Sequence, residues 1–409
     1  MKTNFPIDRV REEFPALKRT HNGKQVVYFD GPGGTQFVQG AIDAMRDYMT
    51  GGASNLGACF PTCVETEASI EKAKSDICAL LGAKGCSVAF GANATTMMFH
   101  TARALARQWA KGDEIILSEL DHHSNIDSWR TAAEERGVIV KYIPLDTNTL
   151  TLRLDALPEL LTERTRLVAV SAASNCIGTR VDIKAVARLA KTVGALVAVD
   201  AVHAIPHFYI DMNECGIDML FASTYKFFAA HVGMAIIREQ VFESLEVYKV
   251  APATDNIPGR MEIGTQNHEG IPAMSAAVRF IAGLGTGGTL TEQIKSGYEA
   301  IEAHEDAIGE MIRRELRGIG GITLYAAAEG VPKTPTIAFR AQGITPREFC
   351  ERMCEQYSVF IANGDFYAMT LAEKLGIRES GGFIRAGLAP YNTMQEAKRF
   401  IEGVRGIMV

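Results

Sequence analysis

The sequence lacks any apolar run that is both long enough and free enough of charge to cross a bilayer, and residues 1–8 lack the apolar core of a signal peptide. It also lacks a basic stripe, because Lys, Arg, Asp and Glu are mixed along the chain and the formal net charge is -6. We therefore expect no membrane or nucleic acid partner and a cytoplasmic location. No internal repeat or low-complexity segment is present.

Cysteine is sparse, with eight residues scattered over a chain of 409. Cys59 and Cys63 stand one helical turn apart, as do Cys350 and Cys354, but neither pair has a second Cys/His pair at the spacing of zinc ligands. This pattern favours packed, reduced thiols over a disulfide framework. We expect no metal site.

The 47% hydrophobic content is enough for a large core. Apolar segments rich in β-branched residues alternate with helical patterns, as is typical of a largely parallel sheet covered on both faces. The expected strands are 87–90, 114–117, 138–143, 166–171, 196–200 and 336–339, and the expected helices are 97–109, 183–192, 290–319 and a last one from Met394.

The chain divides most naturally at the Gly-rich segment 283–288. We expect a large α/β domain over residues 21–288 and a smaller α+β domain over 289–409. Residues 1–20 are expected to pack with the smaller domain.

Lys226 and Asp200 are the most informative residues. Asp200 closes one buried apolar strand, and Lys226 follows the next apolar run, 219–225. Together they suit pyridoxal 5'-phosphate (PLP), because the lysine forms the Schiff base and the carboxylate keeps the pyridine nitrogen protonated. Each residue also has a simpler interpretation when it is considered alone. Lys226 could be an ordinary surface lysine, and Asp200 could form a buried ion pair with an arginine.

Other polar residues lie beside predicted strand ends. Asn93, Ala94 and Thr95 open a helix, which favours either phosphate binding or simple N-capping. His123 suits stacking on a planar ring, although loop histidines are usually solvated. Asn175 suits donation to a phenolate or a carboxylate, or the holding of a turn. The hydroxyls of Ser223 and Tyr225 are free for a phosphate.

The chain resembles fold-type I PLP enzymes of the class V aminotransferase family, in the branch of cysteine desulfurases and selenocysteine lyases, over essentially its whole length. The matching segments, in order and spacing, are 28–35, 112–118, 121–125, 199–203, 223–226, 262–265 and 385–393.

The resemblance implies a homodimer that binds PLP on a seven-stranded-type, mostly parallel sheet and acts on an amino acid. It makes Lys226 the Schiff-base lysine, Asp200 the partner of the ring nitrogen and His123 the stacking residue. Arg385, helped by Asn175, clamps the substrate carboxylate. The implied phosphate ligands are Asn93, Ala94, Thr95, Ser223, Tyr225 and, from the second subunit, Thr265.

The departures from the family pattern bear on the reaction. His203 stands where the family usually has Gln at the phenolate oxygen, and Tyr225 stands where it has His. Tyr367 occupies the place of the desulfurase cysteine, whereas Cys350 and Cys354 fall on the preceding helical segment. Persulfide formation requires a thiolate.

We therefore predict a C–S β-eliminating lyase, with Lys226, His123 and Tyr367 as catalytic residues and Tyr367 as a general acid or a pocket wall. The alternatives are an aminotransferase, an epimerase, or a desulfurase that uses another thiol, for which the sequence names no sulfur-acceptor protein. A binding module without chemistry is disfavoured, because Lys226, Asp200 and Arg385 are all present.

Overall fold

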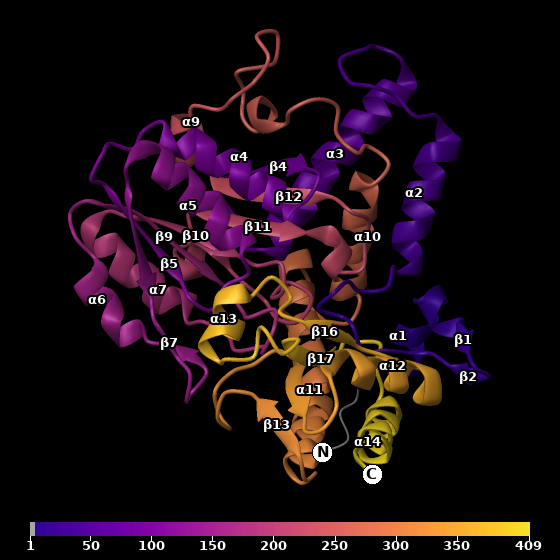
Figure 1. Ribbon diagram of the computed structural model, residues 1–409. Coiled ribbons are helices and arrows are strands. Elements are labelled where there is room, and N and C mark those ends of the chain that lie inside the picture. Colours follow the sequence, from indigo (N-terminus) through magenta and orange to yellow (C-terminus); the bar gives the residue numbers. More distant parts are fainter. Residues whose placement is uncertain (1–4) are drawn as a thin grey trace.

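The computed structural model describes residues 5–409, and its centre is a seven-stranded sheet between two layers of helices (Figure 1). β12 runs antiparallel to both neighbours, and the other pairings are parallel. This confirms the predicted α/β class. In spatial order the strands are β4 (Cys86–Gly91), β12 (Gly233–Arg238), β11 (Met219–Ser223), β10 (Leu196–Asp200), β9 (Thr165–Ser171), β5 (Glu114–Ser118) and β6 (Ile139–Ile143).

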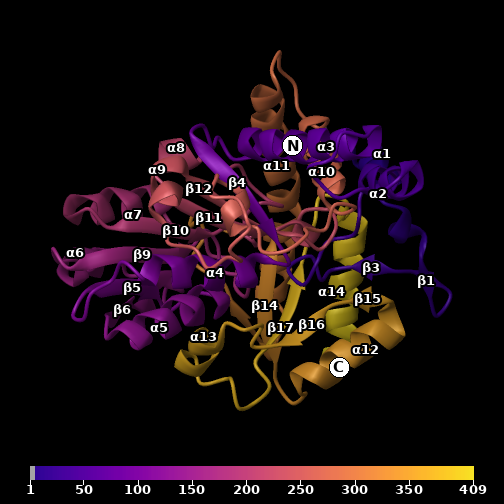
Figure 2. The ribbon, with the colours of Figure 1, turned by 90° about the horizontal axis from the view of Figure 1, so that it is seen from above.

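Both faces of this sheet are buried, which explains the continuous apolar runs of its strands. Side chains alternate along a strand, so Val197 and Val199 of β10 enter one core, whereas Ala198 enters the other. Figure 2 shows the two helix layers on opposite sides of the strands. The first core contains α3 (Pro61–Leu80), α7 (Ile183–Ala190) and α10 (Ile271–Ala282), and the second contains α4 (Ala94–Ala106) and α5 (Ser124–Arg136).

A second, antiparallel sheet of four strands follows in the C-terminal part of the chain. Apolar residues of the long helix α11 (Leu290–Arg317) share its core with β14 and β17. The strands are β13 (Ile322–Tyr325), β14 (Thr336–Ala341), β17 (Phe383–Gly387) and β16 (Ala362–Gly364), and the other helices are α12 (Pro346–Tyr357), α13 (Met369–Lys374) and α14 (Met394–Met408).

The N-terminal segment bridges the two parts of the molecule. Arg9 donates to the Gly283 carbonyl, and Arg11 pairs with Glu396 of α14 over 2.9 Å. Residues 1–4 of the expected N-terminal segment lie outside the described residues, and the division into domains stays our interpretation. The remaining α-helices and β-strands are α1 (Ile7–Glu12), β1 (Thr20–His21), β2 (Lys24–Gln25), β3 (Val27–Tyr28), α2 (Gln39–Gly51), β7 (Leu145–Asp146), β8 (Thr151–Leu152), α6 (Leu157–Leu160), α8 (Met212–Cys215), α9 (Glu239–Ser244) and β15 (Val359–Phe360).

Side chains at the N-cap positions decide where two predicted helices begin. The sequence places one helix at 97–109, but α4 starts at Ala94 because the Asn93 side chain accepts from the Thr96 N–H over 2.9 Å. Thr289 and Glu292 form a capping box that starts α11 at Leu290, as predicted. Within residues 5–409, every helix is too short or too polar to cross a membrane.

Candidate functional site

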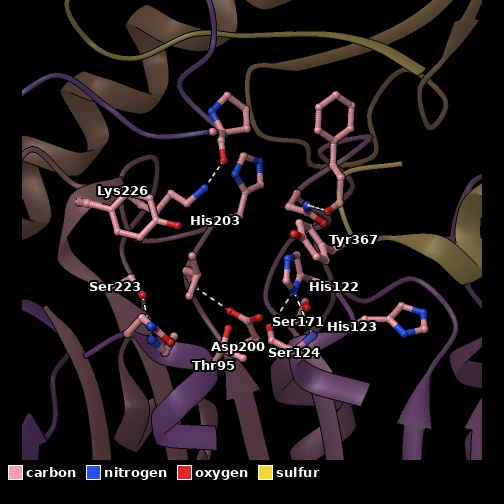
Figure 3. A pocket seen from close by; sticks show the side chains of 18 of the residues that line it. Thr95, His122, His123, Ser124, Ser171, Asp200, His203, Ser223, Lys226 and Tyr367 are labelled. Atoms are coloured by element: carbon pink, nitrogen blue, oxygen red, sulfur yellow. Dashed lines mark hydrogen bonds between the residues drawn. The ribbon is translucent and has the colours of Figure 1, made fainter. Parts of the chain in front are cut away.

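A cavity of about 970 Å³ lies between the carboxyl ends of β9 to β11 and the four-stranded sheet. Ligands of parallel α/β sheets bind at this edge, since the loops after neighbouring strands converge there. Figure 3 shows side chains entering the cavity from loops that are far apart in the sequence. Most of the predicted site residues line it: Asn93, Ala94, Thr95, His123, Asn175, Asp200, His203, Ser223, Tyr225, Lys226, Tyr367 and Arg385.

Lys226 lies in the short 3₁₀ turn Thr224–Lys226 that follows β11, beside the end of β10. Its ammonium group donates to the Pro32 carbonyl. Burial and the nearby Arg385 lower the pKa of Lys226 to about 8. A lysine whose amine is deprotonated this readily suits both nucleophilic attack on a carbonyl and proton transfer.

Asp200 is 6% exposed and has no ion-pair partner among residues 5–409, so the ion pair with an arginine that the sequence left open is not formed. Its Oδ1 accepts from the Val202 N–H over 2.9 Å. Burial, reinforced by the charge of Asp121, raises the pKa of Asp200 to about 7. A buried carboxylate without a cation is costly, and a pyridinium N–H supplies the missing partner.

The start of α4 forms one end of the cavity. The Ala94 N–H donates to Ser223 Oγ over 2.9 Å, while Asn93 caps the helix with its side chain. These groups and the positive end of the helix dipole suit a phosphate. Glycine is required at Gly233 on β12, because a Cβ there would lie 2.1 Å from the Asn93 carbonyl carbon.

His122 faces the interior of the cavity, whereas His123 turns away from it (Figure 3). The Ser124 N–H donates to His122 Nδ1 over 3.0 Å, so Nε2 carries the proton of the neutral ring. Burial, with the charge of Lys226, lowers the pKa of His122 to about 4. Both ring nitrogens of His123 have hydrogen-bond partners. Nδ1 lies 3.2 Å from Asp127 Oδ2, and Nε2 lies 3.2 Å from Thr370 Oγ1.

This arrangement differs from the one that a stacking role for His123 requires. The sequence assigned ring stacking to His123, but its ring joins α5 to α13 at the rim of the cavity. The sequence does not tell which of the two histidines enters the cavity, because adjacent loop residues point in different directions and a one-residue choice between them has no signal.

Arg385 of β17 is buried, and its guanidinium is only partly satisfied. It donates to the Asn175 carbonyl over 3.0 Å and to Asp30 Oδ1 over 3.1 Å, while its Nε has no partner within the described chain. The Phe366 ring covers one face of the guanidinium, with Cζ 3.7 Å from the ring centroid. A guanidinium that lines the cavity and keeps one N–H unpaired suits a carboxylate.

Asn175 contacts the loop above the cavity. Its Nδ2 donates to the Phe366 carbonyl over 2.8 Å, and its Oδ1 is buried without a partner in the described part of the chain. The side-chain amide therefore holds the loop of Phe366 and Tyr367, which have φ angles of 52° and 58°. No pattern in the sequence indicates a role for Phe366, because that role depends on its contact with Arg385.

Tyr367 and Thr265 are exposed, as are Asn93 and Thr95 among the predicted residues. Tyr367 is 73% exposed and lies 5.3 Å, between ring centroids, from His122. Thr265 is exposed and does not line the cavity of its own chain. The structure thus gathers every predicted residue except Thr265.

The residues present fit PLP: an Asp200 carboxylate without a cation partner, a half-buried Lys226, and a phosphate cradle at α4 lie around one cavity. These three features match the ring nitrogen, the aldehyde and the phosphate of that cofactor.

Comparison with known proteins supports the same identification. The sequence profile described as aminotransferase class-V matches residues 27–400. A cysteine desulfurase from Yersinia pseudotuberculosis serotype IB (strain PB1/+) is 28% identical over 420 residues, which cover 99% of this chain and 98% of that protein.

Two solved structures confirm the fold. The cysteine desulfurase CsdA (S-sulfonic acid) from Escherichia coli superposes with a TM-score of 0.84 at 24% identity, covering 98% of each chain. The apo structure of a cysteine desulfurase from Thermococcus onnurineus NA1 gives a TM-score of 0.88 at 21% identity, covering 99% of this chain and 98% of that one.

Proposed function

This chain belongs to the class V aminotransferase family, and we propose that within it the chain acts as a β-eliminating C–S lyase on an amino acid. It is a PLP-dependent enzyme, as members of this family are. When bound, PLP supplies the electron sink that stabilises the carbanion at Cα. The finer assignment depends on which protein groups surround the leaving sulfur.

The observation that carries the proposal is that no cysteine lines the cavity among residues 5–409. Burial raises the pKa of Cys350 to about 12 and also raises those of Cys354 and Cys176 above their usual value. A buried thiol with a raised pKa is a poor nucleophile at neutral pH. Direct loss of the sulfur as sulfide requires no such group.

We assign the following roles to the residues of this chain. Arg385 binds the substrate carboxylate through its guanidinium, which lines the cavity, and this fixes the orientation of Cα. The Lys226 amine removes the Cα proton, a task that suits its lowered pKa. His122, rather than His123, stacks on the cofactor ring, and Asp200 binds the ring nitrogen.

L-Cysteine distinguishes the candidate reactions. Elimination consumes L-cysteine and water and yields pyruvate, ammonia and hydrogen sulfide, whereas a desulfurase yields alanine and leaves the sulfur on an enzyme thiol. We expect equal amounts of pyruvate and free sulfide and no persulfide by mass spectrometry of the intact protein. Alanine together with a persulfide on Cys350, Cys354 or Cys176 would instead establish the desulfurase reaction that the names of the relatives suggest.

Tyr367→Phe tests the role of the tyrosine hydroxyl. Because the side chain is 73% exposed, we expect it to wall the mouth of the cavity, so the variant should keep kcat within about threefold of the native value. A general acid would instead contribute about 100-fold or more. Tyr367→Ala removes the whole aromatic side chain and serves as the matched comparison. A large loss of kcat in Tyr367→Phe, which keeps the ring, would contradict the wall role.

We also propose a homodimer in which Thr265 reaches the phosphate of the partner subunit. Exposed apolar side chains lie on two segments, residues 49–64 and 248–263, and the second leads directly to Thr265. The segments are linked, because His268 Nδ1 is 3.2 Å from the Ser54 carbonyl oxygen. Figure 1 shows both segments projecting from the same end of the molecule. The exposed apolar residues are Met49, Leu56, Phe60, Val64, Tyr248, Val250 and Ile263.

A cytoplasmic location stays a prediction.

Light scattering tests the dimer, because large exposed apolar patches are unfavourable in a monomer. We expect a mass twice that of the 44.4 kDa chain. Thr265→Ala should keep this mass but weaken PLP binding, whereas a monomer that holds PLP fully would contradict the proposal.

A further inference from the structure

His203 is connected to the four-stranded sheet by a buried group of hydroxyls. Its Nε2 lies 3.0 Å from Thr334 Oγ1 and 2.9 Å from Thr336 Oγ1, and the two hydroxyl oxygens are 3.1 Å apart. All three side chains are buried, with exposed fractions of 5% for His203 and 1% for each threonine. Water therefore does not compete for these contacts, and the three groups must satisfy one another.

Each of these groups has a short hydrogen bond only when Nε2 accepts from one of the two hydroxyls. If Thr334 donates to Thr336 and Thr336 donates to Nε2, both hydroxyl protons and the nitrogen lone pair are used, over 3.1 Å and 2.9 Å. If Nε2 carries the proton instead, Thr334 is left with the Gly178 carbonyl at 3.5 Å, which is long for a hydroxyl donor. The geometry therefore favours an Nε2 that accepts.

The second ring nitrogen of His203 is available to the cavity. Nδ1 makes no hydrogen bond within residues 5–409, and His203 lines the cavity beside Lys226 (Figure 3). A neutral imidazole carries a single N–H, so an accepting Nε2 leaves the proton on Nδ1. Burial, with the nearby His207, Arg385 and Lys226, lowers the pKa of His203 well below its usual value and keeps the ring neutral.

Neighbouring groups hold both the two threonines and the His203 ring in place. The buried Arg313 of α11 donates to the carbonyls of Thr334, over 2.6 Å, and Thr336, over 3.2 Å, which holds the two threonines in place. On the other side, the His207 ring packs edge-to-face on His203 with centroids 5.2 Å apart. His207 is held by Glu305 of α11 over 2.9 Å. The orientation of the His203 ring is thus determined from α11 and β14.

We propose that Thr334 and Thr336 are positioning residues that set the tautomer of His203, so that an Nδ1–H donor faces the cavity. This inference rests on the proposed function, because the group that receives the donor is the phenolate oxygen of the cofactor. A neutral N–H at that oxygen supplies a hydrogen bond without adding a charge. Two threonines that lie outside the cavity, at the start of the four-stranded sheet, thereby determine which ring nitrogen of His203 carries the proton.

The tautomer is measured directly by ¹⁵N NMR of the cofactor-free protein with labelled histidine, since protonated and unprotonated ring nitrogens have distinct shifts. His203→Gln removes one of the nine histidines and identifies the signals of His203. We expect the native protein to show predominantly Nδ1–H. The Thr334→Val/Thr336→Val double variant should lower the Nδ1–H to Nε2–H ratio about fivefold, as expected for the loss of one hydrogen bond.

The Thr334→Ser/Thr336→Ser double variant is the matched control, because it keeps both hydroxyls and should keep the native ratio. Predominant Nε2–H in the native protein, or equal ratios in the Val and Ser variants, would overturn the proposal. With PLP bound, the Val variant alone should shift the absorption maximum of the cofactor. Because the NMR measurement requires neither cofactor nor substrate, its outcome is independent of whether pyruvate and sulfide are the products.

Discussion

Lys226→Ala is expected to fold and to bind PLP without a covalent link, so that turnover falls about 10³-fold or more. The reason is that the Lys226 amine enters the cavity, and its pKa, lowered to about 8, makes it available both as nucleophile and as base. Borohydride reduction followed by peptide mapping measures the link, which should be on Lys226 in the native protein and absent in the variant.

Lys398→Ala serves as the control, because this exposed lysine on α14 does not line the cavity. It should keep both the covalent link and the native turnover. If borohydride fixed PLP to another lysine in Lys226→Ala, with turnover retained, the assignment of Lys226 would fail.

Arg385→Lys is expected to lower kcat/KM for the amino-acid substrate about 100-fold, mainly through weaker binding. An ammonium group cannot reproduce the planar edge with which the guanidinium binds both carboxylate oxygens. It also cannot keep the contacts with the Asn175 carbonyl and Asp30 while it binds a ligand. Steady-state kinetics should show the loss for L-cysteine but little change for cysteamine, which has no carboxylate.

Arg340→Lys is a matched control on the adjacent strand β14, since its side chain bonds to Ser380 and the Gly382 carbonyl outside the cavity. It should keep the native preference for L-cysteine over cysteamine. An unchanged preference in Arg385→Lys, in a variant that retains its melting temperature, would show that the carboxylate binds elsewhere.

The sequence by itself determined the α/β class and the cofactor, and it placed Asp200 and Lys226 at one edge of the sheet. Continuous apolar runs indicated strands buried on both faces, and parallel strands end at the same edge of a sheet. The structure makes β10 and β11 neighbours, which brings Asp200 at the end of β10 and Lys226 just past β11 to the same cavity. The family pattern placed Arg385 in the same site, although it lies 159 positions beyond Lys226 in the printed numbering.

Only the tertiary structure decided which way individual side chains point. His122 rather than His123 enters the cavity because Thr370, 247 residues further along the chain, engages the ring of His123. The Asn175 amide holds the Phe366 loop, and His203 meets Thr334 and Thr336 across more than 130 positions. Periodicity determines which face of a strand is buried, but the direction of a loop side chain depends on hydrogen-bond partners that come from distant elements when the chain packs.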